Sequence, residues 1–218
     1  MSKISNAKGR DPETGPSGYE RLFGNAQLGQ LLSKCQATVI STGNELERIL
    51  ENSITETKGL AIGNINKEKR VFKGAKKDAN GKLHDVGIDV VIEKNSKIKL
   101  IELKDGDVFD VKKVAGEVES LLMVKSFLIK EGKFKTEDIE IYFCSFNQEN
   151  KEYIYSGAKG LLPKGSAMTG KELCSDLGID YDRIIRYRKQ EQPENLDFFI
   201  KELIKIPEVK ERLKDLLR

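Results

Sequence analysis

The chain has 218 residues, of which 33% are charged and 38% hydrophobic, and its formal net charge is +3. This length suits one domain of common size with a small appended part, and it is ample for burying a single core. No apolar run approaches the roughly 20 residues that span a bilayer, and the N-terminal residues lack an apolar signal-peptide core, so we expect a soluble, cytoplasmic protein without a membrane partner.

The three cysteines, Cys35, Cys144 and Cys174, are odd in number, widely spaced and not grouped with His84, the only histidine. This pattern indicates neither a disulfide framework nor a zinc site. We therefore expect the cysteines to be small buried hydrophobic residues.

The N-terminal residues 1–18 are rich in Gly, Pro, Ser and charge, which predicts a flexible arm. Over residues 19–38, apolar side chains recur at helical intervals. Gly24 and Gly29 interrupt that pattern, so we predict one or two short helices there.

A further helix is expected over residues 45–54. Residues 41–44 offer side chains that cap helix N-termini, and apolar residues then follow at helical spacing. Glu47 lies at the edge of this apolar stripe. Residues 60–65 and 71–72 are short apolar pieces that indicate an additional strand or a loop.

The most informative stretch comprises residues 85–105. Two short apolar runs, residues 87–93 and 97–104, flank the turn-prone residues 94–96, which predicts a β-hairpin.

Three of the charged residues in this hairpin are candidates for chemistry. Asp89 lies in its first run, and Glu102 and Lys104 close the second. Because side chains alternate along a strand, Glu102 and Lys104 point to one face. Two carboxylates and an ammonium group can therefore converge.

The spacing Glu-x-Lys occurs five times in the sequence, but only Glu102 ends a predicted strand and follows an apolar-flanked Asp at hairpin distance. The pattern resembles the catalytic hairpin of the PD-(D/E)xK nuclease superfamily, although Ile88 replaces the usual Pro before Asp89. The alternative is an ordinary solvated hairpin with a surface ion pair.

The resemblance implies that Asp89 and Glu102, with the backbone carbonyl of Leu103, bind Mg²⁺ and that Lys104 helps to activate water. In this superfamily a helix before the hairpin often offers one more acid to the metal site, and Glu47 is the matching residue. A solvated helix glutamate is the alternative interpretation of Glu47.

After the hairpin, residues 111–130 show helical periodicity and residues 138–146 alternate as a strand. A helix that joins two strands of one sheet favours parallel pairing. We expect an α/β fold with a restriction-endonuclease-like core, in which helices flank a mixed central sheet, and a mainly helical C-terminal extension. The expected parts are the arm at 1–18, the core at 19–155 and the extension at 156–218.

Two basic segments are candidates for contact with DNA. Residues 67–82 include Lys73 and Lys76. Residues 169–189 predict two short helices joined by a turn, loosely similar to a helix-turn-helix, and packing against the core is the alternative role for them. The candidate DNA-binding residues in this second segment are Arg183, Arg186, Arg188 and Lys189.

The last stretch, residues 196–218, has an apolar stripe at helical spacing and a break at Pro207. Such a terminal amphipathic helix usually packs into the core and less often forms a dimer interface.

Within the superfamily, a chain of this length with extra elements after the core looks most like a type II restriction endonuclease. The resemblance implies Mg²⁺-dependent cleavage of double-stranded DNA by a homodimer. The alternatives are a nuclease that resolves junctions or repairs DNA, and a nonenzymatic DNA-binding regulator that uses residues 169–189.

Overall fold

The structure is a computed structural model that describes residues 2–56, 70–106 and 109–218. Internal contacts divide the chain into two compact units. One unit is Leu46–Tyr181, and the other combines Met1–Glu45 with Asp182–Arg218. This division differs from the predicted boundaries after residues 18 and 155, because α1 (Lys3–Asn6) packs against α8 (Gln192–Leu203).

A four-stranded sheet forms the centre of the unit Leu46–Tyr181. Its strands, in spatial order, are β3 (Val90–Lys94), β4 (Lys97–Lys104), β5 (Ile139–Ser145) and β6 (Ala167–Thr169). β3 is antiparallel to β4, whereas β4, β5 and β6 run parallel. The expected fold class is confirmed, because helices flank a mixed sheet and the C-terminal region is helical.

The predicted hairpin is β3–β4, closed by Asn95 and Ser96 with φ of 52° and 61°. Two residues with positive φ give the turn whose twist matches that of the strands. The first strand is shorter than the predicted run 87–93, since β3 begins at Val90. The reason is that the Ile88 N–H donates to the carbonyl of Arg70, at 3.1 Å, outside the β3–β4 ladder.

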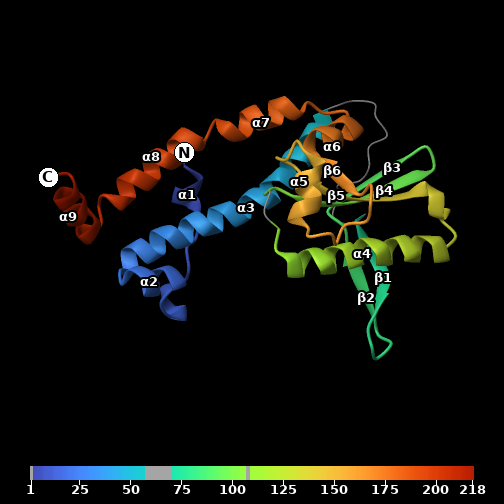
Figure 1. Cartoon of the computed structure of the whole chain (residues 1–218), viewed down its shortest axis with the longest axis horizontal. Coiled ribbons are helices and arrows are strands. Elements are labelled where there is room, and N and C mark those ends of the chain that lie inside the picture. Colours follow the sequence, from blue (N-terminus) through green and yellow to red (C-terminus); the bar gives the residue numbers. More distant parts are fainter. Residues whose placement is uncertain (1, 57–69, 107–108) are drawn as a thin grey trace. The chain divides into compact units, whose positions relative to one another are not determined.

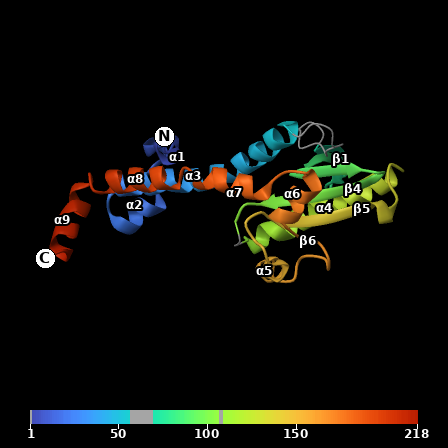
Figure 2. The ribbon, with the colours of Figure 1, turned by 90° about the horizontal axis from the view of Figure 1, so that it is seen from above.

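Helix α4 (Val111–Lys130) confirms the predicted helix and joins the parallel strands β4 and β5. It lies alongside β4 and β5 in both views (Figures 1 and 2). Ile98 and Leu100 of β4 share a buried cluster with Leu121 and Val124 of α4. Because side chains alternate along a strand, Glu102 and Lys104 belong to this same face, which α4 covers.

A two-stranded antiparallel ribbon, β1 (Val71–Lys77) and β2 (Leu83–Gly87), also packs against α4. Phe72 and Val86 join the cluster beneath that helix. The rest of the ribbon extends past α4, away from the sheet (Figure 1). The weakly predicted strand at residues 71–72 is thus part of a longer one, while residues 60–65 lie outside the described residues.

Two further elements precede the predicted helix pair: α5 (Lys151–Gly157) and the short strand β6. The pair itself is confirmed as α6 (Gly170–Leu177) and α7 (Tyr181–Lys189), and Gly178, with φ of 68°, ends α6. Thr169 and Glu172 form a reciprocal cap at the start of α6.

The unit formed by both ends of the chain is helical. Its elements are α1, a 3₁₀ turn (Pro12–Thr14), α2 (Gly18–Phe23), the first part of α3 (Ala26–Glu56), most of α7, α8 and α9 (Pro207–Leu216). The prediction of a flexible arm at 1–18 is wrong for its first residues. The Ser2 hydroxyl and the Lys3 N–H both donate to Asn195 Oδ1 of α8, at 2.9 and 2.8 Å.

The predicted break before residue 45 is also wrong, because α3 continues through it as one helix of 31 residues. The hydroxyls of Ser41 and Thr42 donate to the carbonyls of Thr38 and Val39 in the preceding turn. They therefore bond within the helix instead of capping a new one. Leu46 and Leu50 of the predicted stripe are fully buried, as expected.

The C-terminal break is confirmed, since Pro207 occupies the start of α9. The apolar residues Leu196 and Ile200 of α8 remain about half exposed, at 59% and 46%, so they are not core in the single chain. Cys144 and Cys174 are buried free thiols, and Cys35, also a free thiol, is partly buried. Among the described helices, none is both long and apolar enough for a membrane span.

Candidate active site

Asp89, Glu102 and Lys104 meet where the hairpin reaches the carboxyl end of β4. Val90 of β3 pairs with Ile101 of β4. Asp89 and Glu102 are the residues next to this pair on the two sides of the hairpin. Asp89 Oδ2 accepts a hydrogen bond of 2.8 Å from the Leu103 N–H. The Lys104 ammonium donates to Glu102 Oε1 at 2.6 Å. The three predicted residues are therefore brought together.

Burial disfavours the charged form of both carboxyl groups in the protein without metal. Glu102 is only 9% exposed. Burial and the negative charge of Asp89 raise the pKa of Glu102 to about 7, although Lys104 acts to lower it. Burial also raises the pKa of Asp89, against the opposing effects of the Leu103 hydrogen bond and the Lys104 charge. One lysine does not compensate two buried acids, so the site favours a further cation.

Glu117 of α4, which the sequence pattern did not single out, also reaches this group of side chains. Its Oε1 accepts a hydrogen bond of 2.7 Å from the Lys104 ammonium. Its Oε2 is buried and has no hydrogen-bond partner among the described residues. The available signal was its position, since Glu117 stands between the buried residues Val114 and Val118 on the helix that follows β4.

Glu47 lies near the site but reaches it through another side chain. Its Oε2 accepts a hydrogen bond of 2.9 Å from Arg70, which also donates to the backbone carbonyl of Asp89. Arg70 belongs to the basic segment predicted to contact phosphate, yet it is only 5% exposed. Its role is therefore internal, and it connects α3 to the start of β3.

The side chains that meet here suit a hard divalent cation better than a soft one. Among residues 2–56, 70–106 and 109–218, no group of three His, Cys, Asp or Glu side chains is arranged to hold a metal ion. Mg²⁺ needs fewer protein ligands, since it prefers oxygen and keeps several waters. Asp89 and Glu102 could supply carboxylate oxygens of this kind, and the Leu103 carbonyl is the third oxygen expected from the sequence. Glu117 Oε2, which has no hydrogen-bond partner among the described residues, belongs to the carboxylate that binds Lys104.

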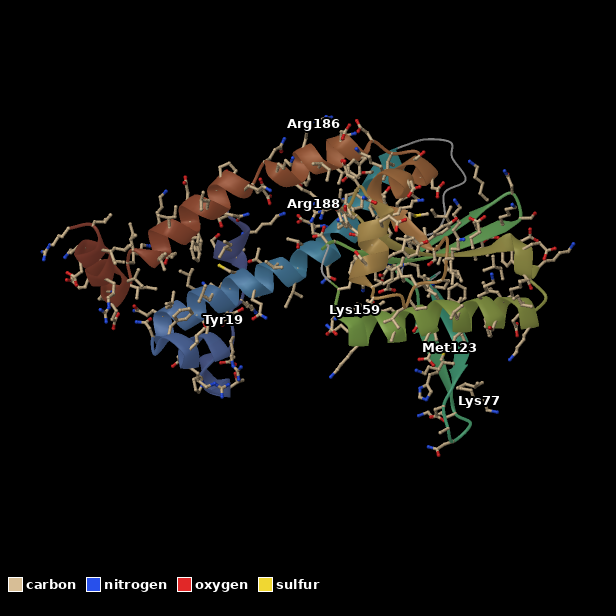
Figure 3. The ribbon with its side chains drawn as sticks, in the orientation of Figure 1. Tyr19, Lys77, Met123, Lys159, Arg186 and Arg188 are labelled. Carbon is tan, nitrogen blue, oxygen red and sulfur yellow. The ribbon has the colours of Figure 1, made fainter. Side chains whose placement is uncertain are left out.

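The candidate DNA-binding residues fall into two separate groups. Lys73 and Lys76 are exposed on β1, in the ribbon where Figure 3 labels Lys77. The second group lies on α7, where Figure 3 labels Arg186 and Arg188. In that group Arg183, Arg186 and Lys189 are exposed, and Arg188 is partly buried. The two groups belong to different units.

Comparison with known proteins identifies the family. A curated relative is 43% identical over 230 aligned residues, which cover 98% of this chain and 99% of the relative. The chain therefore belongs to the type II restriction enzymes, which are site-specific deoxyribonucleases. The relative is the type II restriction enzyme HhaII of Haemophilus parahaemolyticus. No protein-family model matches the chain, and no solved structure matches it.

This membership confirms the predicted enzyme class and decides between the alternatives. A restriction enzyme acts on double-stranded DNA and uses a divalent metal ion. The membership favours neither a nonenzymatic regulator nor a nuclease selective for DNA junctions.

Proposed function

We propose that this restriction enzyme is a PD-(D/E)xK nuclease that hydrolyses both strands of a short DNA sequence with Mg²⁺, at a site made by Asp89, Glu102 and Lys104. The observation that carries the proposal is the meeting of these three side chains at the end of β4, in a chain whose family cleaves DNA. The raised pKa of Glu102, about 7, adds support, because a cation would relieve that unfavourable burial of charge.

Each residue of the site has a distinct task. Asp89 and Glu102 would hold the metal ion, and the Leu103 carbonyl would assist them. When bound, Mg²⁺ supplies charge stabilisation at the phosphoryl oxygens and at the leaving 3′ oxygen. The Leu103 N–H keeps Asp89 turned toward β4. Glu47, through Arg70, orients the backbone at Asp89.

Lys104 works as a cation in this proposal. Burial alone would lower its pKa, but the charges and hydrogen bonds of Glu102 and Glu117 outweigh that effect and raise the pKa. An ammonium group orients the attacking water and offsets the negative charge that grows in the transition state. It does not serve as the base at neutral pH.

DNA contact is assigned to the two basic groups. Lys73 and Lys76 lie on a ribbon, and a two-stranded ribbon fits the major groove. Arg183, Arg186, Arg188 and Lys189 of α7 form the second surface. The enzyme acts as a homodimer, because two equivalent sites related by a two-fold axis match the two strands of a palindrome.

The test is incubation of the purified protein with a long DNA duplex in Mg²⁺ and in EDTA. Discrete fragments that appear only with Mg²⁺ are expected. Cleavage confined to branched DNA would overturn the proposal in favour of a junction nuclease. Binding without cleavage would overturn it in favour of a regulator.

A further inference from the structure

Lys104 has two carboxylate partners that come from different elements. Glu102 is its neighbour on β4, and its Oε1 lies 2.6 Å from the ammonium nitrogen. Glu117 reaches Lys104 from α4, with its Oε1 at 2.7 Å. The catalytic lysine is thus held between the strand that supplies the proposed metal ligand and the helix that covers it.

The two partners differ once a metal ion is present. Glu102 would then direct its charge at the cation, and the ammonium group of Lys104 would be repelled by the positive charge of the ion at short range. Both effects weaken the contact between Lys104 and Glu102. Glu117 is not among the proposed metal ligands, so its contact with Lys104 persists.

The backbone that carries Glu117 is well anchored. Val114 and Val118, three residues before and one after it, are 1% and 7% exposed in a core cluster with Phe143 of β5. Its second oxygen is buried without a hydrogen-bond partner in the described structure. That oxygen is available to the ammonium group when Glu102 turns to the metal.

We infer that Glu117 is a positioning residue that keeps Lys104 at the scissile phosphate while Glu102 is bound to metal. The inference rests on the proposed function, since it takes Lys104 and Glu102 in the roles assigned above. Glu117 acts through Lys104 and touches neither DNA nor metal. Without it, the ammonium group would be repelled from the metal and lose its alignment.

The variants for the test are Glu117→Ala, which removes the acceptor, and Glu117→Gln, which keeps an acceptor oxygen of the same shape without the charge. Glu119→Gln is the matched control, because Glu119 is exposed two residues further along α4. Three quantities are measured: single-turnover cleavage in Mg²⁺, Mg²⁺ affinity by calorimetry, and acetylation of Lys104 by acetic anhydride, followed by mass spectrometry with and without Mg²⁺.

We expect Glu117→Ala to lose about 100-fold in the single-turnover rate, as misplaced catalytic groups do. Its Mg²⁺ affinity should remain that of the parent. Acetylation of Lys104 should rise on addition of Mg²⁺ in this variant and stay low in the parent. Glu117→Gln should recover part of the cleavage rate and part of the protection of Lys104 from acetylation. Glu119→Gln should match the parent.

Parental cleavage by Glu117→Ala, or Lys104 acetylation in that variant that does not respond to Mg²⁺, would overturn the inference. Loss of Mg²⁺ affinity in both Glu117 variants would also overturn it, since Glu117 would then be a metal ligand. If Glu102→Ala still cleaves DNA, the proposed site fails, whatever the acetylation result. The two failures are thus distinguishable.

Discussion

Glu102 is buried beside a second acid, and its pKa of about 7 means that much of it is protonated at neutral pH without metal. Asp89 shares this environment, because burial raises its pKa as well. Two buried carboxylates side by side destabilise the protein without metal, and a bound cation would remove that destabilisation. A residue that destabilises the metal-free fold is typical of a functional site.

Replacing either acid should stop cleavage and spare the fold. Asp89→Ala and Glu102→Ala each remove a proposed metal ligand, so we expect a loss of about 10³-fold or more in Mg²⁺-dependent cleavage, equivalent to several kcal/mol. DNA binding in Ca²⁺ should persist or tighten, because a carboxylate no longer repels the phosphate. The measurements are single-turnover rates and binding titrations.

The control for those variants is Glu93→Ala, an exposed acid on β3 of the same hairpin. It should cleave like the parent protein. Near-parental cleavage by the Asp89 or the Glu102 variant would contradict the assignment of the site.

The raised pKa of Glu102 predicts a pH-dependent stability. Its pKa rises from 4.5 to about 7 on folding, so folding favours the protonated acid. The contribution of Glu102 to the free energy of unfolding is therefore most favourable below pH 4.5, and it is lost as the pH rises through 7. In EDTA, Glu102→Gln should therefore melt higher than the parent at pH 8, with a smaller difference at pH 5.

Thermal unfolding at the two pH values checks this prediction. Added Mg²⁺ should raise the melting temperature of the parent but not that of Glu102→Gln, because ligands stabilise only the state that binds them. A variant less stable than the parent at pH 8 would contradict the proposed electrostatic cost.

Lys104 and Glu47 should differ in what their removal affects. Lys104→Ala is expected to lose turnover while keeping Mg²⁺ affinity, since the ammonium group stabilises the transition state. Glu47→Ala should have an intermediate effect on turnover, because Glu47 acts on Asp89 through Arg70. Calorimetric titration of Mg²⁺ and single-turnover rates, measured for both variants, distinguish an effect on metal affinity from an effect on turnover. Full activity of the Lys104 variant would rule out its role.

At the scale of elements, helix α7 and the ribbon β1–β2 are the two candidates for reading DNA bases. Arg186 is exposed on α7 and Lys76 on β1. Replacing a residue that reads bases by Ala should cost about 1–3 kcal/mol of binding free energy, and only for the cognate site. Replacing a residue that contacts phosphate should weaken binding to all duplexes alike and flatten the salt dependence of binding.

Binding of Arg183→Ala, Arg186→Ala and Arg188→Ala to cognate and scrambled duplexes in Ca²⁺, at several salt concentrations, distinguishes these outcomes. We expect at least one of these variants to show the selective loss. Parental binding by all three would move the reading surface to the ribbon, where Lys73→Ala and Lys76→Ala are the next variants.

At the scale of the whole molecule, the proposed cleavage of both strands needs two active sites. We therefore expect sedimentation equilibrium to give about twice the mass of the single chain, whose composition corresponds to 24.5 kDa. The half-exposed apolar residues Leu196 and Ile200 of α8 are candidates for the interface. Leu196→Glu should then shift the enzyme toward monomers and reduce concerted double-strand cleavage. A monomeric parent that cuts both strands at once would contradict the homodimer.

Much of the nuclease core could be predicted from local signals. The hairpin, α4 and β5 are continuous stretches in which one period dominates, and apolar alternation or helical spacing is visible without knowledge of the partners. The helix break at Pro207 has an equally local cause. The continuity of α3 was missed, because Ser41 and Thr42 suit both a cap and a helix interior, and their surroundings decide between the two.

The sequence by itself determined the candidate acids and lysine, because period-2 alternation puts Glu102 and Lys104 on one face and the hairpin turn brings Asp89 back beside them. Only the tertiary structure decided that Glu117 and Arg70 belong with them. Both arrive from elements distant along the chain, at positions where a charged side chain also suits a solvated surface. Packing of α4 over the sheet, which brings Glu117 to Lys104, is a contact between elements that no local period encodes.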